Sequence, residues 1–441
     1  MNSYIPSSEA AQKKMLAAIG VESISDLFAH LPQAVRDAAD FSEVLPALDD
    51  ISLRKHLLAL SGKNVTMDSH ACFLGAGIYD HFLPPIVSSI CARSEFYTAY
   101  TPYQPEASQG VLQSIYEFQS LICQLFGMDV SNASMYDGAT ALAEAVIMAC
   151  DLKKRKKVAL PSTLHPSCRQ VIETYSLPLG IELVTVDADA STGQLPVSIP
   201  EGVACLVVQS PNFHGVIEDL KALADAAHEA DALLVATVNP IALGLLETPG
   251  ACGVDICVAE GQSLGVFPAL GGPLLGVFTC RKEFLRRIPG RIVGVTTDTE
   301  GTRAFVMTLR AREQDIRRDT ATSNICTNQA LFALAATVYM AAYGKTGMAK
   351  VANLNLQKAH YAAEQIAQIP GYSLAYTGPF FNEFVVKTPS DPVALNKTLL
   401  EAEILGGLPL PELGNAMLLC VTEQRSKEEI DALISVLAGA H

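Results

Sequence analysis

The sequence has no tryptophan, and only 17% of its 441 residues are charged. Lysine and arginine are outnumbered by acids, giving a formal net charge of −15, whereas proteins that bind phosphate backbones carry excess basic residues. No apolar run reaches the roughly 20 residues that a membrane helix needs. The first six residues, MNSYIP, lack the basic-then-apolar order of a secretory signal. We therefore expect a cytoplasmic protein that binds neither nucleic acid nor a membrane.

The eleven cysteines are scattered, and none forms a CxxC pair. Such a distribution is typical of a reducing compartment rather than of a disulfide framework, and it predicts no metal site. The sequence also contains no P-loop, GxGxxG fingerprint, HExxH motif or nucleophile elbow. The chain therefore carries none of the short motifs that identify several large enzyme classes.

Hydrophobic residues make up 49% of the chain, enough for a large core. From about residue 110 to residue 290, stretches with helical patterns separate short apolar runs that lack polar alternation. Such runs are typical of parallel strands covered on both faces. The helical stretches are 110–126, 140–152 and 220–230, and the apolar runs are 157–160, 182–186, 204–208, 232–238, 256–259 and 274–280. This repeated βαβ pattern predicts an α/β fold with a mainly parallel sheet.

The sequence outside this region differs in character, so we expect the whole chain to have three parts. Residues 1–70 form an N-terminal helical segment, 71–330 the large α/β domain, and 331–441 a long helical connection followed by a smaller α+β C-terminal domain. Within the large domain, the stretch 72–110 is rich in glycine, proline and tyrosine, which favours loops over regular elements.

Two features could bind a ligand on the evidence of the residues alone. Gly138, Ala139 and Thr140 begin a helix, and the backbone N–H groups of such a turn suit a phosphate. Ordinary helix capping explains the same residues equally well. His165 and His214 follow strands, at the sheet edge where ligands usually bind, although both are also typical polar loop residues.

Three longer motifs are more specific: FLGAGIYDH at 73–81, YTAYTPYQPE at 97–106 and ATSNICTNQAL at 321–331. In this order they resemble the P-proteins of the glycine cleavage system, also called glycine dehydrogenase (decarboxylating). The resemblance is to subunit 1 of the two-chain form and covers nearly the whole chain. It implies the type I fold of pyridoxal-phosphate-dependent transferases.

The resemblance also implies an activity, which belongs to the oxidoreductases. Glycine condenses with pyridoxal phosphate and loses its carboxylate as CO2, and the aminomethyl group passes to the lipoyl arm of the H-protein. The cofactor accepts the electrons released by decarboxylation, and a lysine of the protein holds it between turnovers.

This sequence departs from the family's catalytic half at that lysine. There the lysine follows a histidine at the end of the strand before a glycine-rich turn, which is 270–273 here. Gln262 and Ser263 stand in place of histidine and lysine, and the next lysine is Lys282. The acid expected at the end of the 232–238 strand is also missing, since Thr237 and Val238 stand there. We expect no covalently bound cofactor, no catalytic residue in this chain alone, and a vestigial site at 138–140.

The expected partner is the catalytic subunit 2, which would carry the pyridoxal phosphate in an α2β2 assembly that acts on glycine and the lipoylated H-protein. The residues expected to form a wall of the partner's site or of the lipoyl channel are Tyr97, Tyr100, Tyr103, Thr322, Ser323 and Asn324. Their alternative role is interface or loop packing. Two other functions stay open: a purely structural or regulatory pseudoenzyme, and an independent pyridoxal-phosphate aminotransferase or decarboxylase.

Overall fold

The computed structural model describes residues 7–39, 42–100, 102–269 and 272–439. The chain divides into two compact units, Met1–Val65 and Thr66–His441. Helices of the first unit are α1 (Glu9–Ile19), η1 (Ile24–Phe28), α2 (Gln33–Asp37) and α3 (Asp50–Ser61). None of these helices contains a buried residue, so the unit has no core of its own among its described helical residues.

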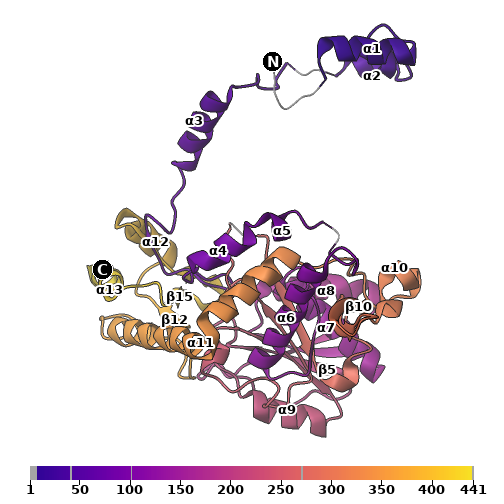
Figure 1. Ribbon diagram of the computed structural model, residues 1–441. Helices are drawn as coiled ribbons and strands as arrows, with labels where there is room; N and C mark the ends of the chain where they lie inside the picture. The colour runs from indigo at the N-terminus through magenta and orange to yellow at the C-terminus, as the bar shows by residue number, and fades with distance from the viewer. Residues whose placement is uncertain (1–6, 40–41, 101, 270–271, 440–441) are drawn as a thin grey trace. The chain divides into compact units, whose positions relative to one another are not determined.

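A seven-stranded sheet organises the second unit (Figure 1). Its strands follow the spatial order β2-β8-β7-β6-β5-β3-β4. Their bounds are β2 Val130–Ser131, β3 Lys157–Pro161, β4 Glu182–Val186, β5 Cys205–Ser210, β6 Leu233–Val238, β7 Ile256–Glu260 and β8 Gly276–Cys280. Strands β3 to β7 pair in parallel, which confirms the mainly parallel sheet.

Alternate residues of the strands enter two separate cores, one on each face of the sheet. Leu206 and Val208 of β5 join one core, while Cys205 and Val207 join the other. The first core includes α6 (Gln109–Phe126), α9 (Leu220–Glu229) and part of α11 (Ala330–Ile366), and the second includes α7 (Gly138–Lys153) and α8 (Pro166–Ser176). Burial on both faces explains why the strands read as unbroken apolar runs.

Two local expectations are wrong. The apolar run at 274–280 does not run parallel to its neighbour, because β8 pairs with β7 in the antiparallel sense. The stretch 72–110 is not loop throughout, since it contains α4 (Pro85–Cys91) and α5 (Ser94–Tyr97). Pro85 is the first residue of α4, a position where proline fits because its missing N–H would have no helical partner.

The C-terminal region contains a second, antiparallel sheet with the order β11-β12-β15-β14. Its strands are β11 Ser373–Leu374, β12 Glu383–Lys387, β15 Ala416–Cys420 and β14 Leu408–Pro409, and its helices are α12 Pro392–Glu401 and α13 Lys427–Gly439. The helix α11 leads into this region and breaks at Gly344, whose φ of 58° and ψ of −178° are not helical. A third core lies between this sheet, α13 and the end of α11.

A short segment joins the two sheets. Strand β1 (Ala71–Cys72) pairs in parallel with β13 (Ile404–Leu405) of the C-terminal region. The following residues, 73–82, form what we call the strap. Its Asp80 carboxylate accepts a hydrogen bond from Arg425 at 2.9 Å, and both side chains are nearly buried.

Candidate functional site

The position expected to hold a lysine lies just beyond β7, and Ser263 occupies it. Ser263 is 3% exposed, and its Oγ has no hydrogen-bond partner among the described residues. The neighbouring Gln262 is fully engaged: its Oε1 accepts from the Tyr79 backbone N–H at 2.9 Å. Its Nε2 donates to the carbonyls of Tyr79 and Val266 at 3.0 and 2.6 Å. The chain's own strap therefore fills the position beside Ser263.

The start of α7 is closed by a carboxylate of this chain. Asp137 caps the helix by accepting from the Thr140 backbone N–H at 2.7 Å. Glu260, the last residue of β7, accepts from the Gly138 N–H at 2.8 Å. A Cβ on Gly138 would lie 2.8 Å from the Glu260 backbone nitrogen, so only glycine allows this approach. The positive end of the helix dipole thus faces a carboxyl group of the chain itself.

Two further backbone N–H groups point at the same carboxylate. Glu260 accepts from Gln262 at 2.9 Å and from Leu275 at 3.0 Å. Burial raises the pKa of Glu260 to about 7, against the lowering effect of its three N–H partners. Phosphate-binding turns present the same kind of donor to a ligand, and here Glu260 occupies these donors.

Other positions of the expected pocket carry no group that could replace the missing ones. Thr237 and Val238 end β6 and are both buried. Lys282 is exposed at the start of η4 (Lys282–Phe284), beyond β8. Of the glycine-rich turn at 270–273, residues 270 and 271 lie outside the described part of the chain.

The strap contacts a second buried acid, which the sequence did not suggest. Glu383, the first residue of β12, accepts from the Ala76 backbone N–H at 2.6 Å and from the Tyr79 hydroxyl at 2.7 Å. Burial raises the pKa of Glu383 to about 7. In the sequence, Glu260 and Glu383 are seen only as glutamates at one end of an apolar run. Such residues are common, so the pattern alone does not identify these two acids.

The two histidines are held by the surrounding chain. His165 Nε2 lies 2.9 Å from the Ala76 carbonyl, and its Nδ1 accepts from the Ser167 N–H at 3.1 Å. His214 stacks on Tyr376 with ring centroids 5.2 Å apart. Burial lowers the pKa of both imidazoles, which favours their neutral forms.

The three tyrosines proposed as wall residues differ in their surroundings. Tyr97 is 70% exposed and Tyr100 is 93% exposed. Tyr103 instead bonds within the chain: its hydroxyl donates to Asn328 Oδ1 at 2.7 Å and lies 3.0 Å from Thr327 Oγ1. The structure therefore separates Tyr103 from the other two by its contacts.

The segment 322–324 lies beside a basic pocket. Thr322 and Ser323 line this pocket together with several arginines, and Asn324 is exposed. Ser323 Oγ accepts from the Ile325 N–H at 3.2 Å. No cluster of three potential metal ligands occurs in the described ranges. All eleven cysteines are free thiols, and none of the described helices is long and apolar enough to cross a membrane.

Comparison with known proteins gives full-length matches. The family model "Glycine cleavage system P-protein" matches residues 2–437. A relative in Desulforamulus reducens, called probable glycine dehydrogenase (decarboxylating) subunit 1, is 52% identical over 99% of both chains. A relative of the same name in Desulfitobacterium hafniense is 49% identical over 98% of both chains.

Solved structures extend the comparison to the fold. A crystal structure of glycine decarboxylase (P-protein) of the glycine cleavage system, in inhibitor-bound form, has a TM-score of 0.93 and 42% identity, covering all of both chains. The sphingosine-1-phosphate lyase of Burkholderia pseudomallei has a TM-score of 0.68 at 15% identity, over 93% of this chain and 94% of that chain. At that identity the second likeness concerns the fold alone.

Proposed function

This chain belongs to the P-protein family of the glycine cleavage system, as a subunit 1 of glycine dehydrogenase (decarboxylating), and we propose that it completes its partner's active site without holding pyridoxal phosphate itself. The family is the pyridoxal-phosphate-dependent, oxidoreductase component that decarboxylates glycine. The proposal concerns the division of labour: subunit 2 carries the cofactor, and this chain supplies a wall of the site or of the lipoyl channel.

One observation carries the proposal: the groups that would hold the cofactor are replaced or engaged. Ser263 stands at the expected lysine position, and a hydroxyl cannot form the imine that an amine forms. The Glu260 carboxylate takes the Gly138 N–H that would face a phosphate. A phosphate at this turn would have to displace the Glu260 carboxyl group from these donors, and its charge would repel the ionised form of that group. The residues present therefore do not fit pyridoxal phosphate.

The partners follow from the family. A chain called subunit 1 implies a second P-protein subunit. We propose an α2β2 assembly with that subunit, which receives glycine and the lipoyl arm of the H-protein. The exposure of Tyr97 and Tyr100 supports their contact with another chain, because tyrosine is enriched at protein interfaces.

The first experiment tests where the cofactor binds. The purified chain, purified subunit 2 and their mixture are each given pyridoxal phosphate, reduced with borohydride and digested to locate any labelled lysine. We expect label only on subunit 2. A labelled lysine of this chain at stoichiometric yield would overturn the proposal and favour an independent pyridoxal-phosphate enzyme.

The second experiment tests the wall residues in the assembled complex. Tyr100→Phe and Ser323→Ala are expected to lower glycine–CO2 exchange, whereas Ser390→Ala, in the C-terminal region, serves as the control. Assembly is checked by sedimentation, so that a loss of binding is distinguished from a loss of exchange. Full exchange in both variants would contradict the wall assignment and favour a purely structural partner.

A further inference from the structure

Basic residues concentrate in one part of this acidic chain. Ten of its 31 lysines and arginines lie between residues 281 and 318, while the whole chain carries a net charge of −15. A pocket of about 340 Å³ opens there. Its lining residues are Arg286, Arg287, Ile288, Pro289, Gly290, Arg312, Glu313, Gln314, Arg317, Thr322, Ser323 and Ile325. Four arginines against one glutamate make the pocket strongly electropositive.

Arg312 carries the clearest sign of a missing partner. Its Nη1 donates to the Ile288 carbonyl, but its Nε and Nη2 are buried without a hydrogen-bond partner among the described residues. Burial lowers the pKa of this guanidinium, yet arginine stays charged in proteins. A buried charge is costly unless an opposite charge and hydrogen bonds compensate it. The neighbouring Glu313 carboxylate offsets part of this charge, but no hydrogen bond joins it to Arg312. The unpaired N–H groups of Arg312 therefore suit an anion.

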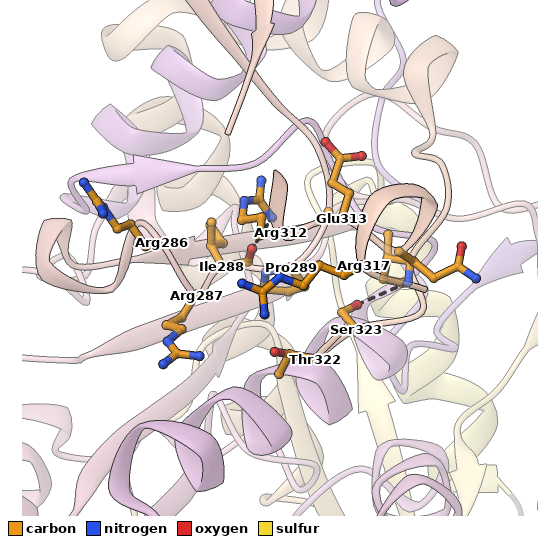
Figure 2. A pocket seen from close by; sticks show the side chains of 12 residues that line it. Arg286, Arg287, Ile288, Pro289, Arg312, Glu313, Arg317, Thr322 and Ser323 are labelled. Atoms are coloured by element: carbon orange, nitrogen blue, oxygen red, sulfur yellow. Dashed lines mark hydrogen bonds between the residues drawn. The ribbon is translucent and has the colours of Figure 1, made fainter. Parts of the chain in front are cut away.

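The other arginines differ in their exposure, their ion pairs and the direction of their side chains. Arg317 is exposed, and its side chain extends across the middle of the pocket, between Arg312 and Thr322 (Figure 2). Arg287 is partly neutralised by Asp151, whose carboxylate lies 2.9 Å from its Nη1. Arg286 points away from the middle (Figure 2). The two guanidinium groups best placed for one ligand are thus those of Arg312 and Arg317.

We propose that this pocket binds a small phosphoryl dianion, with Arg312 and Arg317 as its charged donors and Thr322 as a hydroxyl donor. Two guanidinium groups match a double negative charge, and their forked N–H groups fit phosphate oxygens. The guanidinium groups can bind two phosphoryl oxygens, and the Thr322 hydroxyl can donate a hydrogen bond to the third. The apolar residues of the lining, Ile288, Pro289 and Ile325, hold the rest of the wall. This site is distinct from the start of α7. It shares Thr322 with the proposed wall of the partner's site, but phosphate titration of the isolated chain tests it separately from the proposed function.

The test uses the full chain and inorganic phosphate as the probe. Isothermal titration in phosphate-free, low-salt buffer is expected to give saturable binding of one phosphate, weakened by added chloride. Arg317→Gln should weaken binding about tenfold or more, because a charge-assisted hydrogen bond is lost. Arg318→Gln removes the same charge one residue away, outside the lining, and should change affinity by less than about threefold.

Two comparisons make the result decisive. Thr322→Val should also weaken phosphate binding while leaving the thermal midpoint of the unliganded chain unchanged, since Thr322 is exposed. Acetate, a monoanion, should bind more weakly than phosphate. Absence of saturable phosphate binding, equal losses in Arg317→Gln and Arg318→Gln, or equal affinity for acetate and phosphate would each overturn the proposal.

Discussion

The carboxylate of Glu260 accepts a hydrogen bond from the backbone N–H of Gly138 at 2.8 Å, so the first N–H of α7 is satisfied from within the chain. The two residues lie 122 positions apart in the sequence. Their contact joins the end of β7 to the start of α7, at the sheet edge where the fold usually binds its ligand.

Glu260→Gln is expected to destabilise the chain. The amide keeps one acceptor oxygen but turns its NH2 group toward a backbone N–H, leaving that donor without a partner. The free energy of unfolding should fall by roughly 1–3 kcal/mol at about pH 8. Urea unfolding measures it, with Glu173→Gln on the exposed face of α8 as the matched control. Equal stability of Glu260→Gln and wild type would show that the three N–H contacts contribute little.

Gln262→Ala and Ser263→Ala are expected to differ sharply although the two residues are neighbours and both are buried. Gln262→Ala leaves two groups of Tyr79 and the Val266 carbonyl unpaired, so it should cost roughly 2–5 kcal/mol. Ser263→Ala removes a hydroxyl that has no partner among the described residues, and should change stability by less than about 1 kcal/mol. Thermal unfolding of both variants checks this order, and a larger loss in Ser263→Ala would refute it.

Stability should depend on pH through Glu144 on α7. Burial raises the pKa of Glu144 from 4.5 to about 7, with the Ser323 hydroxyl opposing the shift. The folded state then binds the proton more tightly than the unfolded state, so stability falls as the pH rises between these two values. Between about pH 5.5 and about pH 8 the loss from this group is on the order of 2 kcal/mol.

Glu144→Gln removes that titration and should make the fall in stability shallower by the same amount. Urea unfolding at the two pH values measures the difference, and Glu173→Gln, which changes an exposed carboxyl, should keep the wild-type slope. An unchanged slope in Glu144→Gln would mean that Glu144 titrates near its ordinary value.

Tyr103→Phe and Tyr100→Phe should separate packing within the chain from contact with another chain. Tyr103→Phe loses the bond to Asn328 and should lower the stability of the isolated chain by about 1 kcal/mol. Tyr100 is 93% exposed, so Tyr100→Phe should leave that stability unchanged. Thermal unfolding of the isolated chain checks both; destabilisation by Tyr100→Phe alone would reverse the assignment.

The sequence predicted much of the regular structure because local rules govern it. Ser426 and Glu429 have the residue types and spacing of a capping box, and the box forms with N–H contacts of 2.6 and 3.1 Å. Asp391 followed by Pro392 is a typical helix start in the sequence, and Asp391 caps α12 in the structure. The direction of β8 could not be predicted, because parallel and antiparallel buried strands have the same apolar pattern. The neighbouring strand in the sheet decides the pairing.

The candidate site was predicted less completely, for a related reason. Ser263 could be placed by its resemblance to the family, since the surrounding turn fixes the alignment. The hydrogen bonds of Glu260 could not be predicted, because its partners come from positions that only the folded sheet brings together. Glu383 is more remote still, 307 residues from Ala76.

The strap has a consequence for the order of events during synthesis. It leaves the ribosome early, but Glu383, Glu423 and Arg425, which hold it, are made 304 to 345 residues later. At elongation rates of about 5–20 residues per second, this delay is tens of seconds. Until then the apolar side chains of the strap, such as Phe73, have no core to enter. The nascent chain is therefore expected to need protection by chaperones until its last helix has been made.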